Sequence, residues 1–173
     1  MNFSYVHLLN ENFSPNSRVW VYQCNRQFSI DEALDIEVLL ENFTSNWENH
    51  GAPVCGRGYL LFGQFIILIV DEKNNPIGGC STDSSIRLIK EIQQKFSVNL
   101  FDRTSLAFIR KEKIELLPLS QFQYAVNNQF ITEETLYFNN TIQTKKELEE
   151  NWIISVKNSW LNKKTNFKNT STS

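Results

Sequence analysis

Three short segments of the chain carry the apolar pattern of β-strands. Arg18 to Cys24 alternates and is rich in β-forming residues, so it predicts the first strand. Arg57 to Phe62 and Phe65 to Asp71 predict two more, and the short Gly63-Gln64 link between them favours an antiparallel hairpin. Because Phe65 to Val70 is apolar on both faces, we expect this strand to lie in the centre of its sheet.

Two helices follow from apolar residues that recur at helical spacing. Ser29-x-x-Glu32 has the form of a capping box and opens the first helix, which we expect to end near His50-Gly51-Ala52-Pro53. The apolar face of this helix consists of Ala33, Ile36, Leu40, Phe43 and Trp47. A second amphipathic helix is predicted over Ser85 to Phe96. Each helix should cover a sheet with its apolar face.

The remaining segments extend an alternating order of strands and helices. They predict a strand at Thr104–Arg110, a strand at Ile114–Leu119, a short helix at Leu119–Asn127, a short strand at Thr135–Phe138, and a helix from the Thr144-x-x-Glu147 capping box through Glu150. The first six elements run β-α-β-β-α-β, the order of the split βαβ arrangement. The sequence therefore predicts an α+β protein with a ferredoxin-like antiparallel sheet, helices on one face, and an irregular C-terminal extension.

Length and composition bound the domain organisation. The 173 residues, of which 41% are hydrophobic, are enough to bury a substantial core in one domain. We place this single α+β domain at residues 1–156. From Lys157 onward the chain becomes polar and basic, so residues 157–173 are expected to form a mobile tail.

Charge, hydropathy and cysteine usage exclude several classes of protein. The net charge of −2 argues against a general polyanion binder, so nucleic acid is not an expected partner. The longest apolar run, Phe65 to Val70, is too short to cross a bilayer, and Met1 to Tyr5 lacks the basic start of a secretory signal. We therefore expect a cytoplasmic protein without membrane attachment, in which Cys24, Cys55 and Cys80 are reduced thiols.

One loop concentrates reactive and polar groups. Gly78 to Ser85 joins an apolar strand to an amphipathic helix, and a helix N-terminus favours an anion or an ionised thiol. Cys80 is the candidate nucleophile, and His50 is the histidine that we pair with it as a base. The candidate ligand-binding residues are Gly78, Gly79, Ser81, Thr82, Asp83 and Ser84. The same residues also suit an ordinary cap, with the Asp83 carboxylate in place of a bound anion.

Two other kinds of site are suggested more weakly. Asp71, Asp83 and Asp102 follow predicted elements and carry the oxygen ligands of magnesium, but they serve equally well as turn residues, so we predict neither a metal site nor a cofactor. The aromatic strands Val19–Tyr22 and Arg57–Phe62 suggest RNA binding as a lesser alternative. In RNA-recognition domains, however, the Arg-Gly-aromatic strand is the third strand, whereas here it is the second.

The aromatic content of 13% favours an interaction module. Trp152 and Trp160 lie late in the chain, where they pack the C-terminal segment either onto the body of the protein or onto a partner. We therefore predict a non-catalytic binding or regulatory module with an unidentified protein partner. The alternative is a thiol- or anion-dependent enzyme centred on the Gly78 to Ser85 loop, with a small anion as its ligand.

A resemblance to a family rests on four stretches of the sequence. These are Arg18–Arg26, Gly79–Ser85, Phe101–Arg103, and Phe138-Asn139-Asn140-Thr141 through Glu150-Asn151-Trp152. Together they resemble a family of small uncharacterised bacterial proteins that are often labelled automatically as ABC-transporter ATPases. The resemblance extends over roughly Arg18 to Trp160 and implies a single domain with no catalytic residue to carry over. Because the chain has no GxxxxGK[ST] loop, it lacks the usual cradle for phosphates, and we expect no ATPase activity.

Overall fold

A computed structural model describes residues 2–73 and 76–165 of the chain. It divides into two compact units, which we call the N-terminal unit (Phe3–Asp102 with Asn140–Glu149) and the C-terminal unit (Met1–Asn2, Arg103–Asn139 and Glu150–Ser173). The chain thus leaves the N-terminal unit and returns to it. Two units that share the chain in this way can still fold as one domain, so the single domain over residues 1–156 stays a prediction.

The N-terminal unit is a mixed α+β structure. Its elements are η1 (Val6–Leu8), β1 (Arg18–Gln23), α1 (Ile30–Ser45), β2 (Glu48–Asn49), β3 (Ala52–Pro53), β4 (Gly56–Leu61), β5 (Phe65–Val70), α2 (Gly79–Lys95) and most of α4 (Lys145–Asn151). The main sheet has the antiparallel order β1-β5-β4, and all six residues of β5 are buried. The predicted hairpin and its central strand are therefore confirmed.

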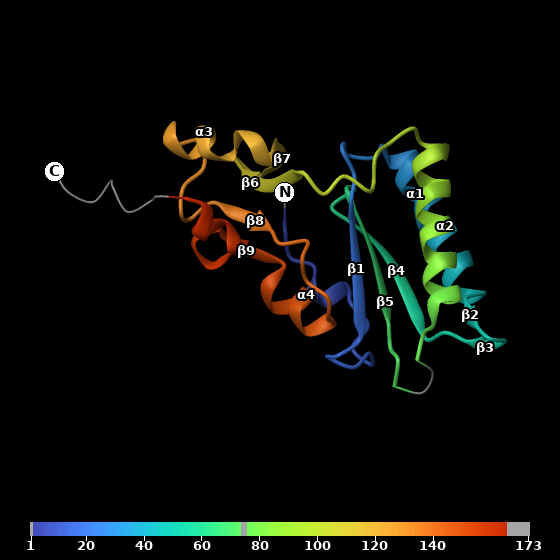
Figure 1. Cartoon of the computed structure of the whole chain (residues 1–173). Coiled ribbons are helices and arrows are strands. Elements are labelled where there is room, and N and C mark those ends of the chain that lie inside the picture. The colour runs from blue at the N-terminus through green and yellow to red at the C-terminus, as the bar shows by residue number, and fades with distance from the viewer. Residues whose placement is uncertain (1, 74–75, 166–173) are drawn as a thin grey trace. The chain divides into compact units, whose positions relative to one another are not determined.

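Both α1 and α2 cover the same face of this sheet (Figure 1). Ile66 and Leu68 of β5 point to that face, where they join a core with Leu40 of α1 and Ile89 of α2. Glycine allows α1 to approach β4 closely, because a Cβ at Gly58 would lie 3.0 Å from the Cβ of Leu40. The pairing of small residues on the strand with large residues on the helix therefore sets the spacing of these two layers.

The predicted bounds of the two helices need correction. The Ser29–Glu32 capping box opens α1 as predicted, but α1 ends at Ser45, where the Asn46 side chain donates a hydrogen bond of 2.7 Å to the carbonyl of Asn42. The predicted end near His50 instead forms the small β2-β3 hairpin. The second helix starts at Gly79, six residues before the predicted Ser85, because its first turn has a cap that comes from another part of the chain.

The late segment of the N-terminal unit pairs with the outer edge of β1. Val19 donates a hydrogen bond of 2.9 Å to the carbonyl of Gln143, and Arg18 forms an isolated bridge with Thr144. The N–H of Lys145 donates to the carbonyl of Ser17 at 2.8 Å. The Thr144–Glu147 capping box that opens α4 is confirmed by reciprocal hydrogen bonds of 3.2 Å. Residues 143–145 therefore take the position beside β1.

The C-terminal unit contains a second antiparallel sheet. Its elements are β6 (Ser105–Arg110), β7 (Lys113–Pro118), η2 (Leu119–Gln121), α3 (Phe122–Asn127), β8 (Leu136–Phe138), β9 (Ile153–Ser155), η3 (Val156–Asn158) and η4 (Trp160–Lys164). The strand order is β7-β6-β8-β9 (Figure 1). The ferredoxin-like arrangement would place β6 beside β1, but β6 is paired on both edges within this sheet. The strand orders confirm an antiparallel α+β structure and do not confirm the ferredoxin-like topology.

The first part of the predicted tail is folded. Lys157 and Asn158 belong to η3, Ser159 caps η4 (Trp160–Lys164), and Leu161 is fully buried in the core of the C-terminal unit. The prediction of a mobile tail that begins at residue 157 is therefore wrong for these residues, because the apolar side chains of Trp160 and Leu161 pack into that core. Residues 166–173 of the predicted tail lie outside the described residues. No helix in the described part of the chain has the length and apolar character needed to span a membrane.

Candidate functional site

The Gly78 to Ser85 loop of the sequence forms the first two turns of α2. Gly78 is the N-cap residue, and it has no side chain with which to cap the helix. Asn49 of the β2-β3 hairpin takes this role from outside the helix. Its Oδ1 accepts hydrogen bonds from the N–H of Gly78 at 3.4 Å and from the Oγ of Ser81 at 2.8 Å, while its Nδ2 donates to the carbonyl of Pro76 at 2.7 Å. This buried amide joins the hairpin to the helix start.

Asn49 was not predicted as a functional or capping residue. It lies 29 positions before Gly78, and a capping signal is read from residues next to the helix. The sequence instead suggested Asp83 as the cap. In the structure Asp83 is exposed in the second turn, after the positions where a side chain can cap the helix. The expectation of a cap from Asp83 is therefore wrong.

The hydroxyl groups of this loop bond to its own backbone. Thr82 Oγ1 donates to the carbonyl of Gly78 at 3.2 Å, and Ser84 Oγ donates to the carbonyl of Ser81 at 2.8 Å. The buried Ser85 donates in the same way to Thr82 at 2.7 Å. These bonds occupy the hydroxyl protons that an anion would need, so an anion at this helix start would rely on backbone N–H groups.

Cys80 lies in the first turn of α2, His50 lies in the β2-β3 hairpin, and both are exposed. His50 is in the turn of the β2-β3 hairpin with a left-handed φ of 51°. A Cβ built on Gly78 would lie 3.7 Å from His50 Nε2, so the fold does bring this ring beside the predicted loop. Among the described residues, however, no hydrogen bond joins the Cys80 thiol to the imidazole. The two predicted catalytic groups therefore lie at the same end of α2 without a formed nucleophile-base contact.

Asp71, Asp83 and Asp102, the three carboxylates that the sequence suggests as metal ligands, do not gather in the described structure. Asp71 accepts hydrogen bonds from the N–H of Ser14 at 3.1 Å and of Lys73 at 3.0 Å, so it organises two turns. Within residues 2–73 and 76–165, no group of three or more His, Cys, Asp or Glu side chains is placed to hold a metal ion.

The aromatic side chains of the first sheet are engaged in packing. Tyr22 is buried and meets Phe101 edge-on at 5.7 Å between ring centroids. Tyr59 accepts a hydrogen bond from the N–H of Asn10 at 3.0 Å, and the Phe62 ring packs against Phe3 at 5.2 Å. Bases stack on aromatic faces that are open to solvent, so these three side chains do not favour the RNA-binding alternative.

The late tryptophans pack inside the C-terminal unit. Trp152 is fully buried and meets Phe138 in a T-shaped contact at 5.3 Å. Trp160 donates a hydrogen bond of 3.2 Å from Nε1 to the hydroxyl of Tyr137. Burial raises the pKa of Tyr137, and this hydrogen bond opposes that shift. Of the two uses that the sequence left open, packing onto the body is the one that these contacts support.

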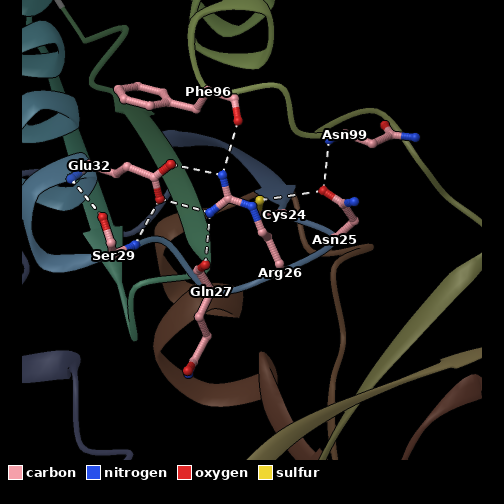
Figure 2. A network of polar contacts seen from close by, with 8 residues as sticks. All are labelled: Cys24, Asn25, Arg26, Gln27, Ser29, Glu32, Phe96 and Asn99. Atoms are coloured by element: carbon pink, nitrogen blue, oxygen red, sulfur yellow. Dashed lines mark hydrogen bonds and ion pairs between the residues drawn. The ribbon is translucent and has the colours of Figure 1, made fainter.

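A polar network around Arg26 connects the β1-α1 loop to the end of α2 (Figure 2). The Arg26 guanidinium forms a two-pronged ion pair with Glu32, with both N–O distances at 2.8 Å, and donates to the carbonyl of Phe96 at 3.0 Å. Glu32 also accepts from the N–H of Ser29, and these hydrogen bonds, chiefly those from Arg26, lower the pKa of Glu32 to about 2. Its charged groups are paired with each other, so we interpret this network as structural.

A groove in the C-terminal unit is an apolar site that the sequence did not indicate. Its volume is about 200 Å³, and it lies between the β7 edge and α3. Buried Phe108 forms part of the lining, while Tyr124 and Phe130 keep 65% and 51% of their surfaces exposed. The Arg110 guanidinium is ion-paired with Glu115 and lies 5.8 Å from the Phe130 ring centroid. Large exposed aromatic residues beside a hollow are typical of binding surfaces.

The strand beside this groove has one unpaired edge. β7 is the last strand of its sheet, and a two-residue turn with positive φ at Lys111 and Glu112 fixes its register with β6. In that register the N–H and C=O groups of Lys113, Glu115 and Leu117 face β6, whereas those of Ile114 and Leu116 face outward. Among the described residues, these outward groups have no hydrogen-bond partner.

No protein-family model, curated protein sequence or solved structure matches the chain. The family resemblance described from the sequence therefore stays a prediction, and the function is argued from the geometry of the two units alone.

Proposed function

We propose that the protein is a non-catalytic binding module that receives an extended peptide segment of a partner protein at the β7 edge. The observation that carries this proposal is the apolar groove beside unpaired backbone groups. The outward N–H and C=O groups of Ile114 and Leu116 match the hydrogen-bonding pattern of an added strand.

The groove gives this strand a place for one side chain. Glu115 and Leu117 point to the same side of the sheet as Phe108, and all three line the groove. A strand added beside β7 would direct alternate side chains to that side, where Tyr124 and Phe130 flank the hollow. Since the Arg110 charge is paired with Glu115, the occupant we propose is an apolar side chain.

A random peptide library displayed on phage and selected against the immobilised full chain tests this proposal. We expect the selected peptides to share an apolar residue in an extended context. Leu116→Pro removes one outward N–H and leaves the hydrogen bonds between β7 and β6 intact. It should therefore lower the affinity for those peptides about fivefold or more relative to Leu116→Ala. Phe130→Ala should weaken them as well. A selection without binders, or peptides that bind Leu116→Pro and Leu116→Ala equally, would contradict the proposal.

The second candidate function is the thiol- or anion-dependent enzyme at the start of α2. The observation that favours it is that Cys80 is exposed in the first turn of α2, whose N-cap residue Gly78 lies beside the His50 ring. Timed alkylation read by mass spectrometry tests it, with the exposed Cys55 as the reference thiol and the buried Cys24 as the unreactive one. An enzyme site requires Cys80 to react faster than Cys55 and to lose this advantage in His50→Ala. Equal rates for the two exposed thiols would leave Cys80 without a nucleophilic role.

Three further expectations from the sequence are kept as proposals. We propose a cytoplasmic location, membership of the family of small bacterial proteins that the chain resembles, and absence of ATP hydrolysis. We also propose a ferredoxin-like topology. It is supported by the order β1-α1-β4-β5-α2 in the N-terminal unit, which only the short β2-β3 hairpin interrupts, and by residues 143–145, which lie beside β1 where the last strand of that topology would lie. Steady ATP turnover by the purified chain, lost on mutation of Gly78, would overturn the proposal about ATP.

A further inference from the structure

The outward face of α1 carries a stripe of exposed aliphatic side chains. Ile30, Leu34 and Val38 are 80%, 58% and 57% exposed, and their spacing of four residues places them on one face over two turns. The opposite face of the helix holds the buried Ile36 and Leu40. Single exposed aliphatic residues are common, but a continuous row on one helix indicates a surface that is covered in a complex.

Carboxylates border this aliphatic stripe. The helix contains five acidic residues and no basic one; the acidic residues are Asp31, Glu32, Asp35, Glu37 and Glu41. Glu32 is paired with Arg26, and Asp35 with Lys95. The other three, Asp31, Glu37 and Glu41, are exposed and have no ion-pair partner among the described residues. The border of the stripe therefore keeps a negative charge of −3 from these groups.

A hollow of about 370 Å³ lies beside the stripe. Glu37 and Glu41 of α1 form one wall, and Arg57 and Tyr59 of the edge strand β4 form another. Two carboxylates face one guanidinium there, so the wall formed by α1 still attracts a cation. The space is large enough for a long side chain with a charged end.

We infer that this face of α1 is a docking surface for a basic amphipathic helix of a partner protein. The straight aliphatic row matches the apolar seam of a second helix packed along it. Lysine or arginine residues beside that seam would meet Asp31 on one side, and Glu37 and Glu41 on the other.

Charge distinguishes this partner from two other occupants of an apolar face. An anionic membrane surface would be repelled by the carboxylate border, which is the opposite of the basic border of membrane-binding helices. A second copy packed about a two-fold axis would bring the α1 carboxylates against the same carboxylates of its partner. A basic amphipathic helix is the occupant that complements both the aliphatic stripe and its negatively charged border.

Two designed helical peptides of roughly 18 residues test the inference on the full chain. One has a leucine seam flanked by lysine, and the other has the same seam flanked by glutamate. Titration calorimetry should show binding of the lysine peptide and at least tenfold weaker binding of the glutamate peptide. Leu34→Gln keeps a similar helix propensity but removes an apolar contact, so it should lower the affinity for the lysine peptide about tenfold.

Charge variants separate this surface from general attraction to an acidic protein. Glu37→Gln with Glu41→Gln should weaken the lysine peptide severalfold, whereas the exposed pair Glu133→Gln with Glu150→Gln, with the same change in net charge, should not. Glu37→Lys with Glu41→Lys should reverse the preference toward the glutamate peptide. Equal binding by Leu34→Gln and the parent, or equal losses in both Gln pairs, would overturn the inference. Self-association that depends on Leu34, without peptide binding, would overturn it in favour of a second copy.

Discussion

At the scale of single residues, two neighbours in the β2-β3 region determine how α1 and α2 meet. Trp47 is buried, packs on Phe43 at 4.7 Å between ring centroids, and donates from Nε1 to the carbonyl of Ser81 at 3.1 Å. Asn49 binds the start of α2 from the same side. The sequence predicted that Trp47 is a core residue of the first helix; its burial is confirmed, but its place on the helix face is wrong, because α1 ends at Ser45 and Trp47 lies beyond it. The role of Asn49 depends on contacts with a distant segment, so it was not predictable.

Replacement of Trp47 by alanine should lower the free energy of unfolding by about 3–5 kcal/mol, through lost transfer energy and the cavity left behind. Urea unfolding followed by circular dichroism measures this change. The matched control is the exposed Tyr124→Ala, which should change stability by no more than about 0.5 kcal/mol. A Trp47→Ala variant that unfolds like the parent would show that this side chain does not anchor α1.

Glu32 should make the free energy of unfolding depend on pH. Its folded-state pKa of about 2 is below the ordinary value of about 4.3, so the carboxylate stabilises the fold above pH 5 and loses this contribution as pH falls toward 2. Glu32→Gln retains a capping residue but removes the charge that Arg26 binds. Melting temperatures of parent and variant should differ most above pH 5 and converge near pH 2. A constant difference at all pH values would contradict the assignment.

At the scale of elements, the predictions succeeded where the signal is local. The Ser29–Glu32 and Thr144–Glu147 capping boxes, the β4-β5 hairpin and the short α3 are present near their predicted positions. The two-residue strands β2 and β3 were missed because they carry too few residues for a periodic pattern. The groove between β7 and α3 was missed as well, since it depends on how a strand edge and a helix pack in space.

Glycine substitutions should separate tight packing between elements from helix propensity. Gly58→Ala would place a Cβ 3.0 Å from Leu40 Cβ and Cδ2, so we expect a loss of about 1–3 kcal/mol. Gly79→Ala meets nothing within 4 Å and replaces glycine in the first turn of α2, so it should be neutral or stabilise by up to about 1 kcal/mol. Thermal unfolding of the parent and of both variants measures these changes in stability. Equal effects would show that β4 and α1 are not closely packed at Gly58.

At the scale of the whole molecule, strand pairing was the least predictable feature. β6 has the length and composition of a sheet-centre strand, and nothing local specifies which sheet receives it. β6 pairs with β7 on one edge and with β8 on the other. In a ferredoxin-like fold β6 would pair with β1, but here Gln143 and Thr144 occupy that edge of β1. The order of strands therefore followed from competition between distant segments.

The returning segment should be required for the N-terminal unit. A chain that ends at Asp102 lacks the hydrogen bonds of residues 143–145 to β1, so we expect it to be less stable and less soluble than the full chain. Addition of residues 140–149 through a long Gly/Ser linker should restore both properties. Urea unfolding and sedimentation compare the three proteins. If the fragment without residues 140–149 is as stable and soluble as the linked one, the segment is not part of the unit's core.

The return of the chain to β1 also determines how long the edge of β1 stays unpaired during synthesis on the ribosome. Residues 3–102 emerge first, with the open edge of β1 able to pair with another nascent chain. That edge can be closed only after about forty further residues, which build most of the C-terminal unit, have left the exit tunnel. During this interval the unpaired edge of β1 is exposed, and slow translation between Asp102 and Asn140 would lengthen its exposure to misassembly.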